Sequence, residues 1–243
     1  MDRNSSFDLD FFTFCKVLWI EFFKEPIDEI SSYRFEATDV IRARFFDAAW
    51  YRIYDFIELI ANFEHDEVNF YPEEFIEFTN KVLESENSGY RLLNGQIVPI
   101  SNEFELSEID ESLIKTQALS SYSGVNLHLN SVIQKLSDRS NPDYRNSIKE
   151  SILAVESICS ILTGDKKATL GVTLKKLETE NKIHSALKTG FSALYGYTSD
   201  AGGIRHKLLE GDSEVSFDEA KFMLVTCSVF INFLISKASK NEK

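Results

Sequence analysis

The chain has 243 residues, a net charge of −13, 43% hydrophobic residues and 27% charged residues. This composition is typical of a soluble globular protein, and the length provides core for one large or two modest domains. Only four prolines are present, which excludes long proline-rich linkers. Three cysteines without metal-ligand or CxxC spacing indicate buried, reduced thiols in a cytoplasmic protein.

The net charge is unevenly distributed along the sequence. Residues 121–243 hold 16 Lys and Arg against 14 Asp and Glu, which leaves 10 basic and 25 acidic residues of the totals 26 and 39 for residues 1–120. An acidic surface repels nucleic-acid phosphates. We therefore expect any RNA contact in the second half, and no DNA partner.

Neither a signal peptide nor a membrane span is expected. The first ten residues are acidic and lack the basic and apolar segments of a signal peptide. The most apolar run, residues 222–235, contains Asn232 and is shorter than the roughly 18–20 residues that span a bilayer. Because this run is apolar around most of a helix, it predicts a helix that is central to a core or shared with a second subunit.

The first part of the chain predicts three helices. Apolar residues at helical spacing predict a helix over residues 7–24, which Pro26 ends. Thr38 is the expected N-cap of one long second helix that continues through Ile60. A third helix is predicted over about 72–86, with proline in its first turn.

A short β-hairpin is predicted over residues 90–100. Its Asn94-Gly95 pair favours a type I′ turn, because both residues accept positive φ. A lone two-stranded hairpin is marginal in water, so we expect it to lie on helices. We interpret it as the joint between domains: residues 1–88 form an acidic, aromatic-rich helical domain, 89–121 the hairpin and connector, and 122–243 a second helical domain.

The second half is predicted to be helical throughout, so the fold class is mainly α. The expected helices cover 107–119 as a connector, then 125–136, 142–163, 170–177, 183–195 and 216–237, with 120–124 as a loop. Asn141 is the expected cap of the third of these, with Pro142 at its first position, and Gly164 ends it. Ser216 and Glu219 fit a capping box for the last helix.

The first 78 residues hold 20 of the 31 aromatic residues. Aromatic side chains can stack on bases, but such sites also need positive charge to hold the nucleic-acid backbone. Because this half is acidic, we predict that its aromatic residues pack in the core.

The strongest candidate site lies in residues 195–209, where a Gly-Gly pair, a carboxylate, an arginine and a histidine converge. His206 can exchange a proton near neutral pH, and Arg205 can hold a phosphate or a developing negative charge. Asp200 can orient His206 or pair with Arg205. Zinc-ligand sets, phosphate-binding glycine loops and nucleophile elbows are absent from the sequence, so no metal or cofactor is expected.

Other ionisable residues have weaker signals. His128 and His184 lie in helical patterns without partners at ligand spacing, so each is interpreted as an ordinary core or surface histidine. A loosely basic stretch is either a solvated helix face or an RNA-binding surface for phosphates. Its four candidate RNA-binding residues are Lys166, Lys167, Lys175 and Lys176.

Three segments, residues 90–100, 141–157 and 199–208, together resemble the AbiJ-type abortive-infection proteins. In that family an N-terminal helical domain precedes a HEPN-like domain (higher eukaryotes and prokaryotes nucleotide-binding). Residues 122–240 resemble the HEPN domain, a helical bundle that usually dimerises. Its active members are metal-independent RNases marked by an arginine, a polar residue, a few further positions and a histidine.

The resemblance implies roles for particular residues. The family histidine falls on His206 and the polar residue on Asp200, whereas the arginine position falls on Ser199, a departure from the family pattern. Arg205 is a candidate to supply the missing positive charge. The implied chemistry is attack of a ribose 2′-hydroxyl on the adjacent phosphate, with a dimer pairing two such loops over one RNA.

The polar side of the predicted helix 142–163 carries Arg145, Lys149, Glu150 and Glu156. These residues are interpreted either as a hydrogen-bonded network supporting the loop of His206 or as ordinary exposed helix pairs.

Two functions stay open at this point. One is a HEPN-type RNase effector of bacterial antiphage defence, favoured by the presence of Asp200, Arg205 and His206. The other is a non-catalytic HEPN-like module that dimerises and senses RNA or a partner, favoured by Ser199. The expected partner is a second copy bound through the C-terminal domain, with RNA and a protein regulator as further candidates.

Overall fold

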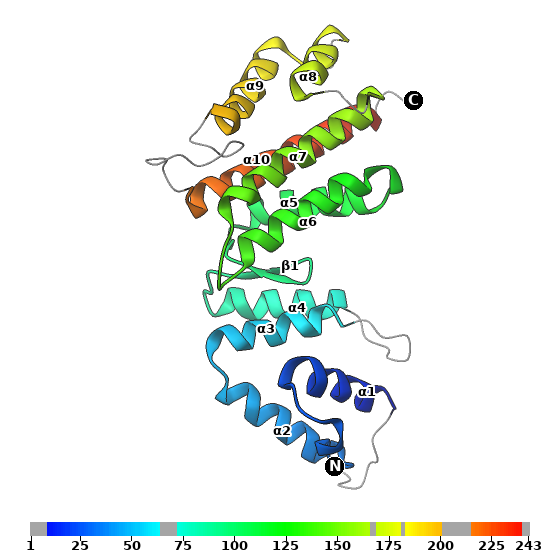
Figure 1. The fold of residues 1–243 in the computed structure, drawn as a ribbon, viewed down its shortest axis with the longest axis vertical. Coiled ribbons are helices and arrows are strands. Elements are labelled where there is room, and N and C mark those ends of the chain that lie inside the picture. Colours follow the sequence, from blue (N-terminus) through cyan, green and yellow to red (C-terminus); the bar gives the residue numbers. More distant parts are fainter. Residues whose placement is uncertain (1–8, 64–71, 166–168, 181–182, 201–214, 240–243) are drawn as a thin grey trace. The chain divides into compact units, whose positions relative to one another are not determined.

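The computed structural model describes residues 9–63, 72–165, 169–180, 183–200 and 215–239. The chain divides into two compact units, Met1–Ile97 and Val98–Lys243. In both units the described residues are mostly helical, and a two-stranded hairpin follows the helices of the first (Figure 1). The prediction of a mainly α fold with two helical regions joined by a hairpin is confirmed.

The described residues of the first unit form four α-helices, two short helical segments of other types and the hairpin. Its elements are α1 Leu9–Val17, a π-helical continuation η1 Leu18–Phe23, a 3₁₀ turn η2 Ile27–Glu29, α2 Arg34–Asp47, α3 Trp50–Ala61, α4 Pro72–Ser85, β1 Arg91–Leu93 and β2 Gln96–Val98. The first helix ends with Lys24 in the left-handed conformation, two residues before Pro26 as the sequence predicts. Pro72 begins α4, also as predicted.

The predicted long second helix is wrong, because the chain breaks between α2 and α3. Ala48 and Ala49 are extended, with ψ of 146° and 148°. The break brings Phe45 of α2 and Phe56 of α3 edge to face, with ring centroids 5.4 Å apart. In one straight helix these residues would be separated by about 16 Å along the axis. Thr38 lies within α2, where its hydroxyl donates to a backbone oxygen instead of capping the helix.

Two hydrophobic clusters form the core of the first unit. One is built around Trp19, which is 2% exposed, and Phe56; the other surrounds Leu83 of α4 and Ile97 of the hairpin. The prediction that the aromatic residues pack in the core is therefore correct for many of them. It is wrong for those with exposed side chains, namely Tyr33, Phe35, Phe46, Trp50, Tyr51 and Phe78.

The hairpin has the predicted turn. Asn94 and Gly95 have φ of 47° and 76°, the positive values that a type I′ turn requires.

Side chains of the first unit satisfy the backbone of this hairpin. The amide group of Asn80 in α4 accepts from the nitrogen of Leu92 at 2.7 Å and donates to its oxygen at 2.8 Å. Glu58 of α3 accepts from the nitrogen of Ile97 at 2.7 Å. The hairpin is thus fixed to α3 and α4, which provides the support that two isolated strands lack.

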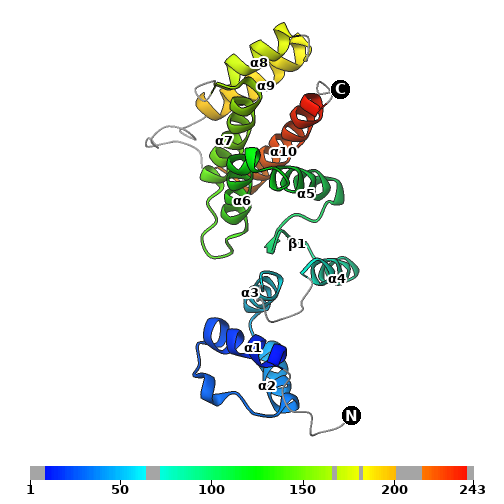
Figure 2. The same cartoon turned by 90° about the vertical axis from the view of Figure 1, so that its right-hand side faces the viewer.

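The second unit is a helical bundle with an added helix pair. Its elements are α5 Glu103–Gln117, a 3₁₀ turn η3 Ser120–Tyr122, α6 Ser123–Ser137, α7 Tyr144–Thr163, α8 Leu170–Thr179, α9 Ser185–Asp200 and α10 Phe217–Ser239. Helices α6 and α10 both pack on α7, α5 packs on α10 and α6, and α8 and α9 pack on each other and on α7 (Figures 1 and 2). The segment predicted as a connector, α5, is therefore an integral part of this bundle.

One side of helix α10 lies in the core, which agrees with the first of the two alternatives that its apolar run leaves open. Leu224, Phe230 and Ile231 are almost fully buried against the neighbouring helices. Within the described ranges, residues Phe217–Ala238 form the single helical stretch that is long and apolar enough to cross a membrane, and about half of its most apolar window is buried inside the protein. A core helix of this kind satisfies the same length and composition test.

The predicted start of α7 is wrong by two residues. Asp143, not Asn141, caps the helix, because its Oδ1 accepts from the nitrogen of Asn146 at 3.0 Å. Asp138 accepts from the nitrogen of Asn141 at 2.9 Å, and this bond holds the preceding residues, with Pro142, in a loop.

Two other predicted boundaries of the second unit are confirmed. Gly164 ends α7 with φ of 71°. The capping box of α10 is formed, with the nitrogen of Ser216 donating to Glu219 at 2.8 Å and the nitrogen of Glu219 donating back to Oγ of Ser216 at 3.4 Å.

Candidate functional site

The candidate site can be described through the helices that flank it. Arg205 and His206 lie outside the described residues, as do Lys166 and Lys167. The backbone of residues 199–200 forms the end of α9, and α10 begins at Phe217. The geometry available is therefore that of the end of α9, the start of α10 and their neighbours.

One carboxylate joins these two helices. The hydroxyl of Tyr197 in α9 donates to Oε1 of Glu219 in α10 at 2.9 Å, and Oε2 of Glu219 accepts from the nitrogen of Ser216. Burial, and then this bond, raise the pKa of Tyr197. The backbone amide of Ser216, and then the phenol, lower the pKa of Glu219. Glu219 is therefore hydrogen-bonded to residues on both sides of 201–214, to the side chain of Tyr197 and to the backbone of Ser216.

A second tyrosine joins the end of α9 to α7. The hydroxyl of Tyr195 donates to Oε1 of Glu156 at 2.9 Å. Thr198 is fully buried, and its hydroxyl donates to the oxygen of Tyr195 at 2.8 Å. These contacts fix the last turns of α9 immediately before Ser199 and Asp200.

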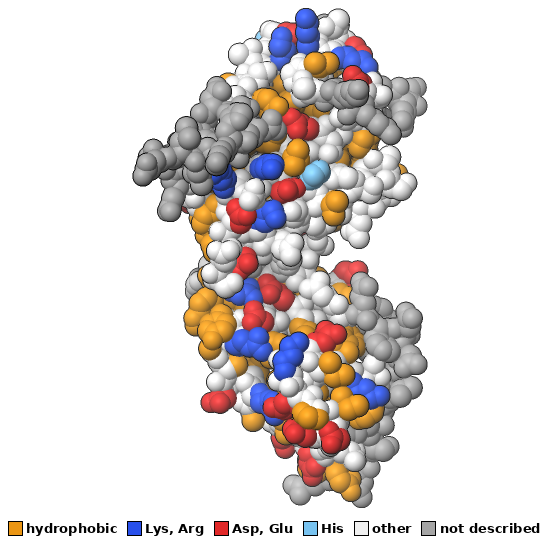
Figure 3. Space-filling model, in the orientation of Figure 1, with side chains coloured by type: hydrophobic (Ala, Val, Ile, Leu, Met, Phe, Trp, Pro, Cys, Tyr) orange, Lys and Arg blue, Asp and Glu red, His pale blue; other side chains and the backbone are white. Residues whose placement is uncertain are grey.

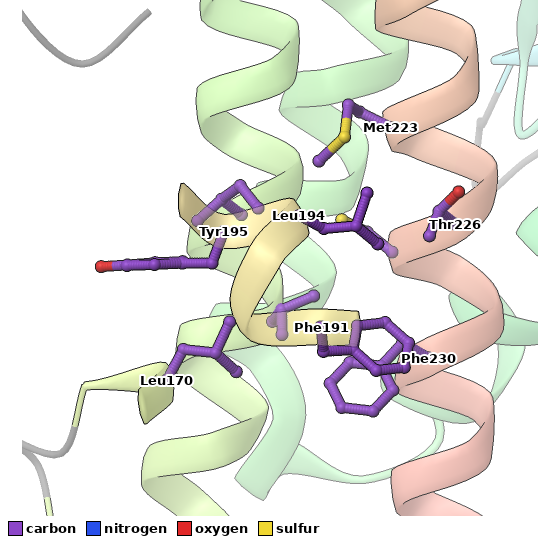
Figure 4. Close-up of a pocket in the computed structure, with 10 residues that line it drawn as sticks. Leu170, Phe191, Leu194, Tyr195, Met223, Thr226 and Phe230 are labelled. Atoms are coloured by element: carbon purple, nitrogen blue, oxygen red, sulfur yellow. The ribbon is translucent and has the colours of Figure 1, made fainter. Parts of the chain in front are cut away.

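A narrow apolar pocket lies beneath α9. Figure 4 shows Phe191 of α9 stacked on Phe230 of α10, with ring centroids 3.5 Å apart, while the hydroxyl of Tyr195 points away from the pocket. The lining residues are Ile152, Val155, Leu170, Phe191, Leu194, Tyr195, Met223, Thr226, Cys227 and Phe230. Such walls offer almost no hydrogen-bonding groups for a phosphate or a base. We therefore assign the pocket to seating α9, not to binding RNA.

The predicted polar network on α7 divides between two neighbouring helices. Glu150 lies 2.7 Å from Nδ1 of His128 on α6, whereas Glu156 contacts Tyr195 on α9. Lys149 is exposed and Arg145 is partly buried on the same helix. His128 has a tertiary partner that its sequence context does not indicate, because the antiparallel packing of α6 on α7 brings together residues 22 positions apart. No local pattern in the sequence indicates that pairing.

The described lysines of the basic stretch lie on α8. Lys175 and Lys176 are both exposed. The ammonium group of Lys176 donates to the oxygen of Thr163 at 3.0 Å, at the end of α7, where a cation is favourable. Lys188 of α9 pairs with Glu178 at 2.6 Å and so ties α8 to α9. Of these three lysines, Lys175 is the one most available to a phosphate.

The thiols of this chain are unsuited to nucleophilic chemistry. Cys15, Cys159 and Cys227 are buried and free, as the sequence predicts. Burial raises the pKa of Cys15 to about 11 and those of Cys159 and Cys227 to about 12, so little thiolate forms near neutral pH. In the described part of the chain, no cluster of three or more His, Cys, Asp and Glu could hold a metal ion.

Comparison with known families identifies the first part of the chain. Residues 4–115 match the family model of AbiJ N-terminal domain 4. This segment is an AbiJ N-terminal domain. The AbiJ domain covers α1 to α4, the hairpin and most of α5, and so extends past the first compact unit. It associates the chain with abortive infection, as the resemblance in the sequence predicts. Neither the curated proteins nor the solved structures contain a match to the chain.

Proposed function

We propose that the region following the AbiJ domain cleaves RNA without a metal ion, as a HEPN-type effector of antiphage defence. His206 acts as a general acid or base, and Arg205 stabilises negative charge on the phosphate. The ribose 2′-hydroxyl attacks the adjacent phosphorus and loses its proton to a base. The bond to the 5′-oxygen breaks, and that oxygen takes up a proton, which gives a 2′,3′-cyclic phosphate and a 5′-hydroxyl end.

The contact of Tyr197 with Glu219 carries this proposal. It holds the end of α9 beside the start of α10, so residues 201–214 leave and re-enter the unit at neighbouring points. Tyr195 and Glu156 fix the same helix end from the other side. The helix ends on either side of residues 201–214 are thus fixed by side-chain hydrogen bonds, and a catalytic group requires a support that is held in place.

The charge distribution supports RNA as the substrate. The acidic residues concentrate in the first half, while residues 121–243 hold two more basic than acidic residues. Lys175 is exposed on α8, the helix that packs against α9. Phosphate groups are therefore repelled by residues 1–120 and weakly attracted to residues 121–243.

A homodimer through α10 forms part of the same proposal. Phe222 and Val229 are 54% and 43% exposed, although the opposite side of this helix is the core of the unit. They are seven positions apart, which is about two helical turns, so both lie on one stripe, which Phe233 extends. A second copy packed on this stripe would bury it and bring two His206 segments to one RNA.

A non-catalytic module is the second candidate function. Ser199 occupies the position where the family arginine is expected, and loss of a charge-stabilising arginine can reduce a rate by about 10²–10³. In that case the second unit dimerises and senses RNA or a partner without cleaving it.

Cleavage of total tRNA in the presence of EDTA separates the two candidates. The enzyme proposal predicts cyclic-phosphate ends that form despite chelation and disappear in His206→Ala. His184→Ala is the matched control, because it removes an exposed imidazole at the start of α9 and should leave cleavage intact. Tight tRNA binding without any cleavage by the wild-type chain would support the module instead.

Sedimentation velocity tests the dimer separately. Val229→Arg should convert dimers to monomers, whereas Val172→Arg, at an exposed valine on α8, should not. A wild-type chain that sediments as a monomer at all concentrations would overturn this part of the proposal.

A further inference from the structure

Four aromatic side chains form a continuous patch on the first unit, where α3 begins and the chain leaves α4. The Trp50 ring lies 6.0 Å from Tyr51, 5.8 Å from Tyr54 and 6.5 Å from Tyr90, and Tyr54 lies 5.2 Å from Tyr90 (centroid distances). Trp50 is 58% and Tyr51 is 49% exposed. In Figure 3 hydrophobic side chains gather at this edge of the first unit. We call these four residues the aromatic patch.

Exposure of such rings is unfavourable unless a partner covers them. Tryptophan and tyrosine bury large apolar areas in cores and interfaces, and contiguous exposed groups of them mark interaction sites. A polar contact also connects one ring of the patch to the residues that follow α4. The hydroxyl oxygens of Tyr54 and Ser88 are 3.4 Å apart, within hydrogen-bonding distance, and this contact restricts the orientation of the Tyr54 ring.

The unit that carries the patch is acidic overall, and the exposed Arg52 beside Tyr51 is paired with Asp55 at 3.2 Å. Residues 1–97 hold 20 Asp and Glu against 9 Lys and Arg. Exposed carboxylates precede and follow the patch in the sequence, at Asp47 and Glu86. The nearest cation in the sequence on the hairpin side, Arg91, is buried, and its guanidinium donates to the backbone oxygens of Ser88 and Tyr90 at 2.8 Å. A positively charged partner is therefore favoured and a phosphate-bearing one is repelled.

The same unit repeatedly places guanidinium groups on aromatic rings. The group of Arg52 lies 4.3 Å from the centroid of the Phe22 ring, and that of Arg44 lies 4.5 Å from that of Phe23. Two further pairs of this kind are Arg34 with Phe11 and Arg42 with Phe46. In the described ranges no lysine or arginine covers the rings of Trp50, Tyr51 or Tyr90, which leaves equivalent ring faces open to a cation from outside.

We propose that the aromatic patch binds an arginine-bearing segment of a partner protein. Guanidinium groups stack on Trp50 and Tyr51, and the surrounding carboxylates balance their charge. RNA bases could stack on the same rings, but their phosphates would face an acidic unit. This binding is independent of the RNase proposal, because it requires none of the residues of the second unit.

Fluorescence anisotropy with a labelled hexa-arginine peptide tests the proposal on the full chain. We expect Trp50→Ala and Tyr51→Ala each to weaken peptide binding roughly fivefold, and labelled hexa-lysine to bind more weakly than hexa-arginine. Phe78→Ala is the matched control, because it removes an exposed ring of α4 outside the patch and should leave affinity unchanged. Intrinsic fluorescence gives a second readout, since Trp19 is buried and Trp50 is the exposed tryptophan.

Several outcomes would overturn the proposal. If the arginine and lysine peptides bind with equal affinity and Tyr51→Ala leaves that affinity unchanged, the binding comes from net charge and not from stacking on the aromatic patch. If the chain binds a labelled uridine decamer and Trp50→Ala abolishes that binding, the ligand of the patch is RNA and not an arginine-bearing peptide. A change in sedimentation coefficient caused by Trp50→Ala, with unchanged thermal unfolding, would make the patch an interface between copies of the chain.

Discussion

Tyr197 and Glu219 form a hydrogen bond of 2.9 Å between the last turns of α9 and the first turn of α10. The two residues are 22 positions apart, and residues 201–214, the segment of Arg205 and His206, lie between them. Because Glu219 also accepts from the nitrogen of Ser216, one side chain both caps α10 and fixes the neighbouring helix. A change at Glu219 should therefore affect the stability of both helices.

The lowered pKa of Glu219 predicts how stability depends on pH. A carboxyl whose pKa is lower in the folded state stabilises it above the unfolded pKa, about 4.3, and this contribution is lost as pH falls through the folded value. Glu219→Gln should therefore lose less stability on acidification than the wild type. Urea unfolding between about pH 6 and pH 3 measures the difference, with Asp218→Asn as the neighbouring control. Parallel curves for Glu219→Gln and the wild type would contradict the prediction.

Asn80 should contribute strongly to the stability of the hairpin. Its amide group satisfies both the nitrogen and the oxygen of Leu92, and Asn80→Ala leaves both without these bonds. We expect a loss of about 1–3 kcal/mol in the free energy of unfolding. Chemical denaturation measures it, and Lys81→Ala, at an exposed surface ion pair one residue further on, should change stability by less than about 0.5 kcal/mol. Similar losses in the two variants would show that the contact with Leu92 is unimportant.

Gly95 should tolerate no side chain. Its φ of 76° is unfavourable for other residues, and an added Cβ would collide with the side chain of Asn62, which donates to the oxygen of Gly95 at 2.7 Å. Gly95→Ala should cost about 1–2 kcal/mol from the backbone conformation alone. Gly89→Ala, where a Cβ would meet open space, is the control. Thermal unfolding of the two variants compares them, and an equal melting temperature would be inconsistent with this account.

The three thiols should resist alkylation in the folded protein. Their raised pKa values and burial leave neither thiolate nor access for iodoacetamide near pH 8. Mass spectrometry should find unmodified native protein and three modifications after unfolding in concentrated guanidinium chloride. Rapid labelling of Cys227 under native conditions would mean that α9 opens from the pocket it covers.

Local features of this fold could be predicted well from the sequence. The Asn94-Gly95 turn, the start of α4 at Pro72, the end of α7 at Gly164 and the capping box of α10 all depend on residues within four positions of one another. The apolar run of α10 likewise predicted its burial. The candidate segment 195–209 was identified by residue type, and Tyr195 at its start contacts Glu156, a residue of the predicted network.

Pairings between distant residues were decided by tertiary structure alone. His128 meets Glu150 across 22 positions, Asn80 meets Leu92 across 12, and the break between α2 and α3 occurs where Phe45 and Phe56 must share one core. The exposure of Trp50 was also decided by tertiary structure, because its position in the sequence pattern is that of a core residue. Local patterns located most of the helices and several of their ends, because backbone hydrogen bonds and caps are local, but they did not show the break that separates α2 from α3. Which side chains meet, and which rings stay uncovered, depended on how the helices pack, because burial is shared between elements far apart in the chain.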